Sequence, residues 1–423
     1  MSGDFAQRYG DVFRNTSFRT FWQGFALSSL GDSMTRVALI WFVYQQTGSS
    51  KALGLLSVCY VGPILIGGLL AGSLLDRFDR RKVMLVDNLI RGSAVATVPL
   101  LYATGRLELW HIYAVAAVYG FLMMISLAGG PSLLPSLVSE EQLITVNALE
   151  MLGFTVGGVL GPVLAGLLIP VIGAPNVLVI DAISYAVFAL ALSRVRVIEP
   201  TESTASSQSS PYRLKDAFRL LTSNSILLST TLMFMTYNIG QGFLFVWLPI
   251  YVSKTLDQGA AVYGLLLGVL AVGELISSLL AGSVRLPLTL GSSICLFQLS
   301  AGLALFPLVM GHLWIALVAV TLHGFFSAPL TIWAQTLRMA IIPERLRGRT
   351  FALLRMLMQG TGPAGGAAAG FLLPLVGVRM MIAMTGLFTG FPGLIGSQVR
   401  QLREGGRPMP DVRDDEPPLQ MPA

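Results

Sequence analysis

Residues 72–85 read GSLLDRFDRRKVML, a stretch in which a long apolar run meets a dense cluster of charges. Six of the seven residues from Asp76 to Lys82 are charged. Lys and Arg beside a membrane span mark its cytoplasmic side, whereas acidic residues contribute little to orientation. The two aspartates, Asp76 and Asp79, therefore need a reason other than orientation.

The composition on either side of this cluster is that of a membrane protein. Of the 423 residues, 54% are hydrophobic and 12% are charged, against about 25% charged in an average soluble protein. So few charges do not cover the surface of a soluble domain, so we predict an all-α protein that crosses the lipid bilayer several times. The basic excess, a net charge of +6, lies in loops between spans, which argues against a nucleic-acid partner.

Apolar runs long enough to cross a membrane recur along the whole sequence. A span needs about 20 mostly apolar residues. On that rule we predict twelve transmembrane helices, at residues 18–45, 52–75, 83–104, 110–135, 143–170, 175–193, 225–252, 261–284, 287–310, 313–337, 349–374 and 377–398.

The loops between these spans carry their positive charges on one side. With the N-terminus placed inside, the inside segments hold 22 Lys and Arg residues and the outside loops hold 4. This asymmetry predicts that both termini are cytoplasmic. Residues 1–22 lack an apolar core with a cleavage site, so we expect the first span to act as the insertion signal.

Composition also divides the chain into five parts. We predict a cytoplasmic N-terminal segment at 1–17, a six-helix half at 18–193, a Ser/Thr-rich cytoplasmic linker at 194–224, a second six-helix half at 225–398 and a charged, Pro-rich tail at 399–423. Their compositions predict that the linker is flexible and that the tail is disordered.

The two predicted halves are also similar in sequence. The pentapeptide LLAGS occurs at 69–73 and again at 279–283, an offset of 210. At an offset of 204, seven residues between Glu140 and Gly173 recur between Glu344 and Gly377. A constant offset indicates duplicated halves, the arrangement with which transporters place one site at the repeat interface.

Ionisable residues inside the predicted spans are the first candidates for function. Asp32 lies roughly 21 Å along the first span, at or beyond mid-membrane. Arg36 follows one turn later, in the favourable acid-before-base order. A charge at this depth costs at least about 2.5 kcal/mol, so it faces the protein interior or a wet cavity. We expect an Asp32–Arg36 pair whose separation switches the protonation of the aspartate. The alternative is a pair that only fixes helix packing.

Other intramembrane charges are ranked below this pair. Glu274, near the middle of the eighth span, is a second candidate for proton or cation handling, or a neutral hydrogen-bonding group. Asp181, near the outer end of the sixth span where water reaches it, is a candidate for substrate or ion contact. Asp87 and Arg91 repeat the acid-before-base spacing on the third span and are interpreted as structural, with Glu150 as a further partner for Arg91.

Aromatic residues accompany the intramembrane acids. Tyr237 and Phe243 are predicted to line a cavity for a bulky, amphiphilic ligand, although Tyr and Trp near span ends are more often interface anchors. The two cysteines and three histidines lack metal-ligand spacing. The sequence also lacks a phosphate-binding Gly-Lys-Ser/Thr loop and a nucleophile–base arrangement. We therefore expect no metal, no cofactor and no enzymatic activity.

The opening stretch carries the strongest family resemblance. Gly72, Asp76, Arg77, Arg80 and Arg81 resemble the loop 2–3 signature of the major facilitator superfamily, G-x-L-x-D-R-x-x-R-R/K. Its position after the second predicted span also fits that family.

Two further stretches resemble the exporting members of this superfamily. The run GGVLGPVLAG at 157–166 resembles their antiporter signature, with Ala165 where a glycine is common. Residues 13–41 resemble the macrolide-efflux and enterobactin-exporter branch of the drug:proton antiporters, whereas the fourth-span arginine signature of many drug antiporters is absent. In the antiporter-like motif we single out Gly157, Gly161, Pro162 and Gly166, since small residues let helices approach closely and a proline bends a helix. The resemblance implies that this tightly packed, bent helix helps to seal one access path, and the alternative is ordinary Gly-mediated packing.

The resemblance implies a fold, a location and a function. It implies two pseudo-symmetric six-helix halves around a central cavity, in a bacterial plasma (inner) membrane. It implies proton-coupled efflux of an amphiphilic small molecule, such as a drug, macrolide or siderophore, by a monomer. Asp32 is then expected to take up a proton outside and release it inside. The alternatives are a lysophospholipid flippase or uncoupled facilitator and, in another class, a non-transporting receptor or scaffold on a transporter fold.

The resemblance also gives the charge cluster a role. Asp76 is expected against the cytoplasmic start of the eleventh helix, near residues 348–350, where free N–H groups and partial positive charge lie. Arg77, Arg80 and Arg81 are expected to tie neighbouring helix ends. The matching place in the second half keeps only Arg285 of this cluster. Together with Gly72, these residues are predicted to form a cytoplasmic gate, closed when the cavity faces outward.

Overall fold

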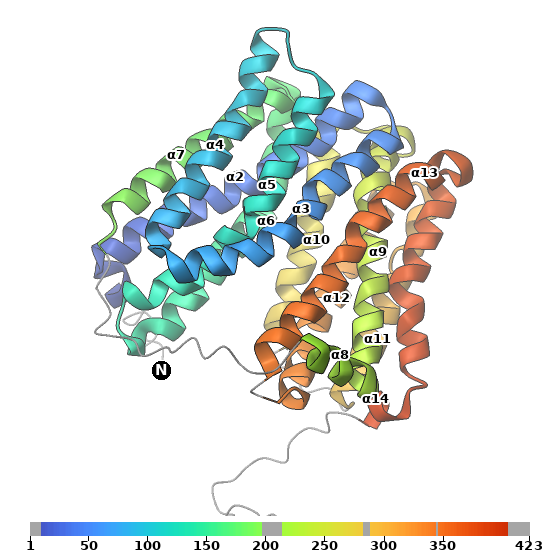
Figure 1. The fold of residues 1–423 in the computed structure, drawn as a ribbon. Coiled ribbons are helices and arrows are strands. Elements are labelled where there is room, and N and C mark those ends of the chain that lie inside the picture. The colour runs from blue at the N-terminus through green and yellow to red at the C-terminus, as the bar shows by residue number, and fades with distance from the viewer. Residues whose placement is uncertain (1–9, 197–213, 282–287, 344–345, 405–423) are drawn as a thin grey trace, which may run out of the picture.

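The fold is a bundle of long helices. A computed structural model describes residues 10–196, 214–281, 288–343 and 346–404. Within these ranges every regular element is a helix, which confirms the all-α prediction (Figure 1). The α-helices are α2 (Thr16–Thr47), α3 (Ser50–Arg77), α4 (Arg80–Ala103), α5 (Leu109–Leu133), α6 (Leu143–Ile172), α7 (Ala174–Arg194), α8 (Leu214–Ser223), α9 (Ser225–Lys254), α10 (Ala260–Ala281), α11 (Leu290–Leu303), α12 (Leu313–Ile341), α13 (Arg347–Gly396) and α14 (Arg400–Glu404). Short 3-10 helices lie at Leu134–Ser136, Glu140–Gln142 and Phe306–Met310.

Many of these helices are suited to a bilayer. In the described part of the chain, nine helices are long and apolar enough to cross a membrane. α2 and α9 have 32 and 30 residues but are not among the nine, because their stretches are less apolar. α13 runs through the last two predicted spans, and its helical geometry breaks at Gly377, with φ 76° and ψ 168°. The protein therefore has several spans, and the number twelve stays a prediction.

Polar residues at the helix starts explain several boundaries. Asn15 and Ser49 cap α2 and α3 by accepting hydrogen bonds from the backbone N–H groups of Phe18 and Ala52. Asp79 caps α4 in the same way, with Arg81 N 2.9 Å from its carboxylate. Capping is thus one reason for an acidic residue in the charge cluster.

Two short helices lie where the sequence predicted a linker and a disordered tail. α8 occupies the end of the 194–224 linker, and its Ala217 and Leu221 are buried. α14 occupies the start of the 399–423 tail, where Leu402 is buried against Gly291. Both predictions are wrong for these residues, because apolar side chains within the polar stretches find packing partners on the bundle. Residues 197–213 and 405–423 lie outside the described ranges.

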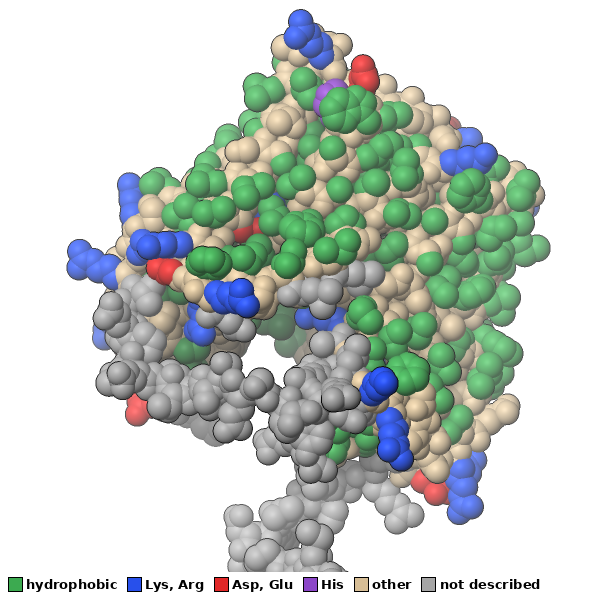
Figure 2. All heavy atoms as spheres, in the orientation of Figure 1, with side chains coloured by type: hydrophobic (Ala, Val, Ile, Leu, Met, Phe, Trp, Pro, Cys, Tyr) green, Lys and Arg blue, Asp and Glu red, His purple; other side chains and the backbone are tan. Residues whose placement is uncertain are grey.

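The described helices form two groups that meet at one end. Figure 1 shows α2 to α7 on the left and α8 to α14 on the right, with α10 next to the left-hand group. The groups touch where Ser50 of α3 donates a hydrogen bond to the backbone oxygen of Gly370 in α13, at 2.9 Å. Figure 2 shows the surface hollowed between the groups at the opposite end, where α8 and α14 lie.

Candidate functional site

A buried ion cluster lies between α2 and α4. Arg91, with a side chain 1% exposed, forms an ion pair with Asp87 at 2.7 Å and a longer one with Asp32 at 3.5 Å. The expected Asp87–Arg91 pair is confirmed. The expected Asp32–Arg36 pair is wrong, because α2 and α4 both pack against α7 and the long side chain of Arg91 reaches Asp32 instead. Asp32 is the accessible member of the cluster, since its side chain is 23% exposed and that of Asp87 is fully buried.

Neutral side chains complete the surroundings of Arg91. The guanidinium donates to the hydroxyls of Tyr185, at 3.0 Å, and Ser126, and it lies over the rings of Tyr185 and Tyr119. The Tyr185 hydroxyl in turn donates to Asp32. Three helices, α4, α5 and α7, thereby hold one guanidinium in place beside α2. Breaking any of these contacts leaves a buried polar group without a partner.

Asp181 of α7 forms a second buried carboxyl site beside this cluster. Its side chain is fully buried, which contradicts the expectation that water reaches it. Close packing against α2 causes this burial, because a Cβ at Gly31 would lie only 2.6 Å from Ser184 Oγ in the next turn of α7. Thr35 Oγ1 donates to the carboxyl at 2.6 Å, and the charges of Asp181 and Asp32 are near enough to interact.

The hydroxyl of Ser184 bears on the protonation of Asp181. It lies 2.8 Å from the backbone oxygen of Asp181 and 3.0 Å from Oδ1 of the same residue. A serine hydroxyl has a single hydrogen and can donate it to only one of them. If it donates to the backbone oxygen, the second contact needs a hydrogen on the carboxyl. The geometry therefore fits a protonated, neutral Asp181.

The sequence indicated some members of this site and missed others. Asp181 and Tyr185 are four residues apart and share a face of α7, a spacing that could have revealed Tyr185. Ser126 of α5 carried no such signal. Glu150 was proposed as a partner for Arg91, but the described residues show no ion pair between them. Its Oε1 atom is instead buried without a hydrogen bond, next to Gly130.

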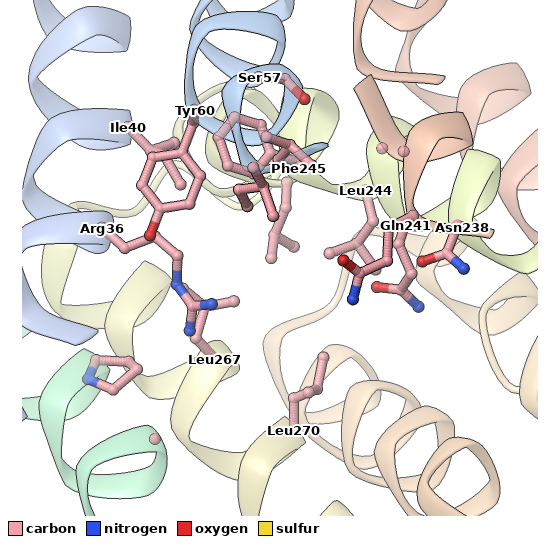
Figure 3. Close-up of a pocket in the computed structure, with 18 of the residues that line it drawn as sticks. Arg36, Ile40, Ser57, Tyr60, Asn238, Gln241, Leu244, Phe245, Leu267 and Leu270 are labelled. Carbon is pink, nitrogen blue, oxygen red and sulfur yellow. The ribbon is translucent and has the colours of Figure 1, made fainter. Parts of the chain in front are cut away.

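A cavity of about 470 Å³ lies between the two groups of helices. α2, α3, α5 and α6 line it from one side, and α9, α10 and α13 line it from the other. Figure 3 shows Arg36 and Tyr60 pointing into it from one wall and the amides of Asn238 and Gln241 from the opposite wall. Its surface is otherwise mostly apolar, as in Leu244, Phe245, Leu267 and Leu270.

Two predicted charges face this cavity from different helices. Arg36 of α2 and Glu274 of α10 both line it, and their charges are near enough to interact. The described part of the chain shows no ion pair between them. The cavity is therefore lined by one basic and one acidic side chain that do not form an ion pair among the described residues.

The predicted lining residues Tyr237 and Phe243 are not among the residues that line the cavity. Phe243 is buried against Phe388, with ring centroids 5.3 Å apart, because its position on α9 faces α13. Tyr237 stacks on His323, which was not predicted as a site residue. His323 contacts the cavity residue Gln241 at 3.0 Å.

Small residues bring α6 into close contact with two helices. Backbone atoms of Ser29 in α2 lie 2.8 Å from the position a Cβ would take at Gly157, and Gly161 packs against Ser33 of the same helix. The other end of the motif faces α10, where Pro162 and Gly166 contact the backbone of Gly264. The expected tight packing is confirmed.

The structure describes only part of the charge cluster at residues 76–82. Arg80 Nη1 donates to the backbone oxygen of Ser132, at 2.7 Å, and Arg81 Nη1 donates to that of Val195, at 2.6 Å. These contacts tie the start of α4 to the ends of α5 and α7, as expected. The side chains of Asp76 and of residues 347–349 lie outside the described part, so the predicted gate contact stays a prediction. Gly72 has open space where a side chain would lie, and Arg77 is exposed.

The sequence and the fold both match known transporters. A family model described as "Transmembrane secretion effector" matches residues 11–415. The chain is 23% identical over 407 residues to macrolide efflux protein A of Streptococcus pyogenes, covering 92% of this chain and 96% of that protein. It is 23% identical over 379 residues to the staphyloferrin A transporter of Staphylococcus aureus, covering 87% of this chain and 92% of that protein. A point mutant of the nucleoside transporter NupG has a similar fold, with a TM-score of 0.74, 12% identity and coverage of 90% of this chain and 99% of that chain.

Proposed function

Because this chain belongs to the transmembrane secretion effectors of the major facilitator superfamily, a family of non-enzymatic transporters, we propose that it exports amphiphilic small molecules in exchange for protons. One observation carries the coupling to protons. Asp32 is partly exposed, yet it contacts a fully buried guanidinium. A carboxylate in that position is partly accessible and at the same time neutralises a buried charge.

The charge balance of this region supports proton binding. Asp32, Asp87 and Asp181 lie around a single guanidinium, that of Arg91. Unpaired charges at membrane depth are costly, so the surplus of negative charge favours bound protons. Asp181 is suited to keep its proton, since it is fully buried among hydroxyls. Asp32 is suited to exchange one, since its side chain is partly exposed.

The proposed cycle follows from this difference. When the cavity faces outward, Asp32 takes up a proton and its hold on Arg91 weakens. When the cavity faces inward, Asp32 releases the proton to the cytoplasm and pairs with Arg91 again. A bundle hollowed at the end where α8 and α14 lie, with Asp32 and Arg91 in contact, fits the second state.

We further propose that twelve spans form two halves, 18–193 and 225–398, that rock about the cavity. The nine candidate spans become twelve when α2 and α9 are added and α13 is counted as two spans that meet at Gly377. The excess of Lys and Arg in the loops on one side supports the proposal that the hollowed end and both termini lie in the cytoplasm of a bacterial cell. Asp76 and the arginines beside it are proposed to close that end in the opposite state.

The contact between α6 and α10 offers a test of this motion. A side chain at Gly264 would clash with the backbone of Pro162 and Gly166, and backbone cannot turn aside as a flexible side chain does. We expect Gly264→Val to prevent the outer ends of the halves from meeting. An Ala271→Cys reporter in the cavity should then react with an impermeant maleimide from outside, in a background with Cys59 and Cys295 replaced by serine.

Gly62→Val is the matched control for this test. It makes the same chemical change on α3, where nothing lies within 4 Å of the added carbon. It should keep the labelling pattern of the unmodified protein. Equal labelling of the two glycine variants from outside would show that this crossing does not seal the cavity.

Transport in inside-out vesicles tests the proposed function itself. With an acidified lumen, the protein should accumulate a labelled amphiphile in the lumen, and dissipating the gradient should stop accumulation. A lysophospholipid flippase or uncoupled facilitator predicts transport that ignores the gradient. A receptor or scaffold predicts no transport at all. Each result separates one alternative from proton-driven efflux.

A further inference from the structure

The cavity is lined by a guanidinium, that of Arg36, that has no partner among the described residues. Asp32, the acid one turn before Arg36 on α2, is engaged by Arg91 and Tyr185. Among the described residues, neither a hydrogen bond nor an ion pair involves the Arg36 side chain, which is exposed to the cavity. Glu274 affects it only from a distance.

The surroundings of Arg36 are suited to an anion. A guanidinium presents its N–H groups as a planar fork that matches carboxylates and other oxyanions. Tyr60 of α3 lies beside Arg36 on the same wall, and both line the cavity (Figure 3). An oxyanion at this place would receive donors from both residues. The Arg36 cation would then gain the partner that its depth in the membrane favours.

The rest of the cavity is suited to an apolar body. Opposite Arg36, Leu244, Phe245 and Leu270 form an apolar wall, interrupted by the amides of Asn238 and Gln241. A volume of about 470 Å³ lies within the usual range of about 300–1,000 Å³ for small-molecule sites.

We propose that the substrate is an amphiphile with a carboxylate or similar oxyanion, which binds to Arg36 and Tyr60 while its apolar part lies against α9 and α10. This inference rests on the proposed function only in taking the cavity as the substrate site. Glu274 lines the same cavity, and its carboxylate would repel a negatively charged ligand. Because its carboxylate weakens the positive field of Arg36, replacing it should strengthen anion binding.

Three probes with one fluorophore test the charge preference. They are dansylglycine, which carries a carboxylate, its neutral amide dansylglycinamide, and the cationic dansylcadaverine. Their binding is measured by fluorescence with the full chain in phosphatidylcholine nanodiscs, without a proton gradient. We expect dansylglycine to bind at least about tenfold more tightly than the other two, since a charge-assisted hydrogen bond contributes about 1.5–3 kcal/mol.

Variants then assign this preference to one residue. Arg36→Gln should abolish it, Arg36→Lys should keep part of it, and Glu274→Gln should increase it. Lys51→Gln is the matched control, because Lys51 is an exposed cation over Phe371 and not a cavity residue. Thermal melting of each variant separates a lost site from a lost fold.

Other results of the same experiments would contradict the proposed anion site. Tighter binding of dansylcadaverine, or a preference that survives in a folded Arg36→Gln variant, would overturn the anion site. Displacement of dansylglycine by phosphatidylglycerol in the nanodisc would assign the site to a lipid headgroup and overturn a soluble ligand. Because no gradient is applied, an anion preference without gradient-driven transport would contradict only the proposed coupling.

Discussion

Asp32→Asn should remove the effect of a proton gradient on transport while leaving the cavity intact. The amide keeps the size of the carboxyl and still accepts a hydrogen bond from Tyr185, but it cannot exchange a proton at physiological pH. In inside-out vesicles with an acidified lumen, accumulation should fall to the rate seen without a gradient. Exchange of labelled for unlabelled substrate, which needs no net proton movement, should persist.

Asp87→Asn is the control for this result. Asp87 contacts the same guanidinium, at 2.7 Å, but its side chain is fully buried and is not placed to exchange protons with the cavity. This variant should keep its dependence on the gradient while melting at a lower temperature. If Asp32→Asn transports against the gradient as the unmodified protein does, Asp32 is not the coupling residue.

Arg91→Met should cost more stability than any other single change in the cluster. The change leaves Asp87 fully buried, and Asp32 partly buried, without a cation. Removing one partner of a buried ion pair typically costs about 3–5 kcal/mol, because the remaining charge stays desolvated. The expected result is a markedly lower melting temperature in detergent or nanodiscs, followed by intrinsic fluorescence.

A second buried arginine provides the matched control for Arg91→Met. Arg338 of α12 is 3% exposed and lies over the Phe234 ring at 4.8 Å. It donates to the backbone oxygen of Thr230, and no carboxylate in the described part of the chain pairs with it. The melting temperature of the Arg338→Met variant should therefore be closer to that of the unmodified protein.

Adding Asp87→Asn to Arg91→Met removes one uncompensated charge. This double variant should regain part of the lost stability. Equal melting of the two Met variants, or no recovery in the double variant, would show that the loss comes from packing rather than from unpaired charge.

The sequence by itself determined the class of fold and the residues that carry charge in the membrane. Long apolar runs have few solutions in lipid other than helices, because every backbone polar group must find its partner within the segment. The helix bounds follow from the same runs and from caps such as Asn15 and Asp79. The i,i+4 pair of Asp87 and Arg91 was readable because both residues lie on one helix.

Only the tertiary structure decided which charges meet. Asp32 and Arg36 share the spacing of Asp87 and Arg91, yet Asp32 pairs across helices and leaves Arg36 to the cavity. Helical spacing limits which neighbours are possible, whereas the packing of α2 and of α4 against α7 sets which of them is near. Glycines at these crossings, such as Gly31 beside Ser184, let the helices approach closely enough to bring Asp32 to a partner on another helix, far away in the sequence.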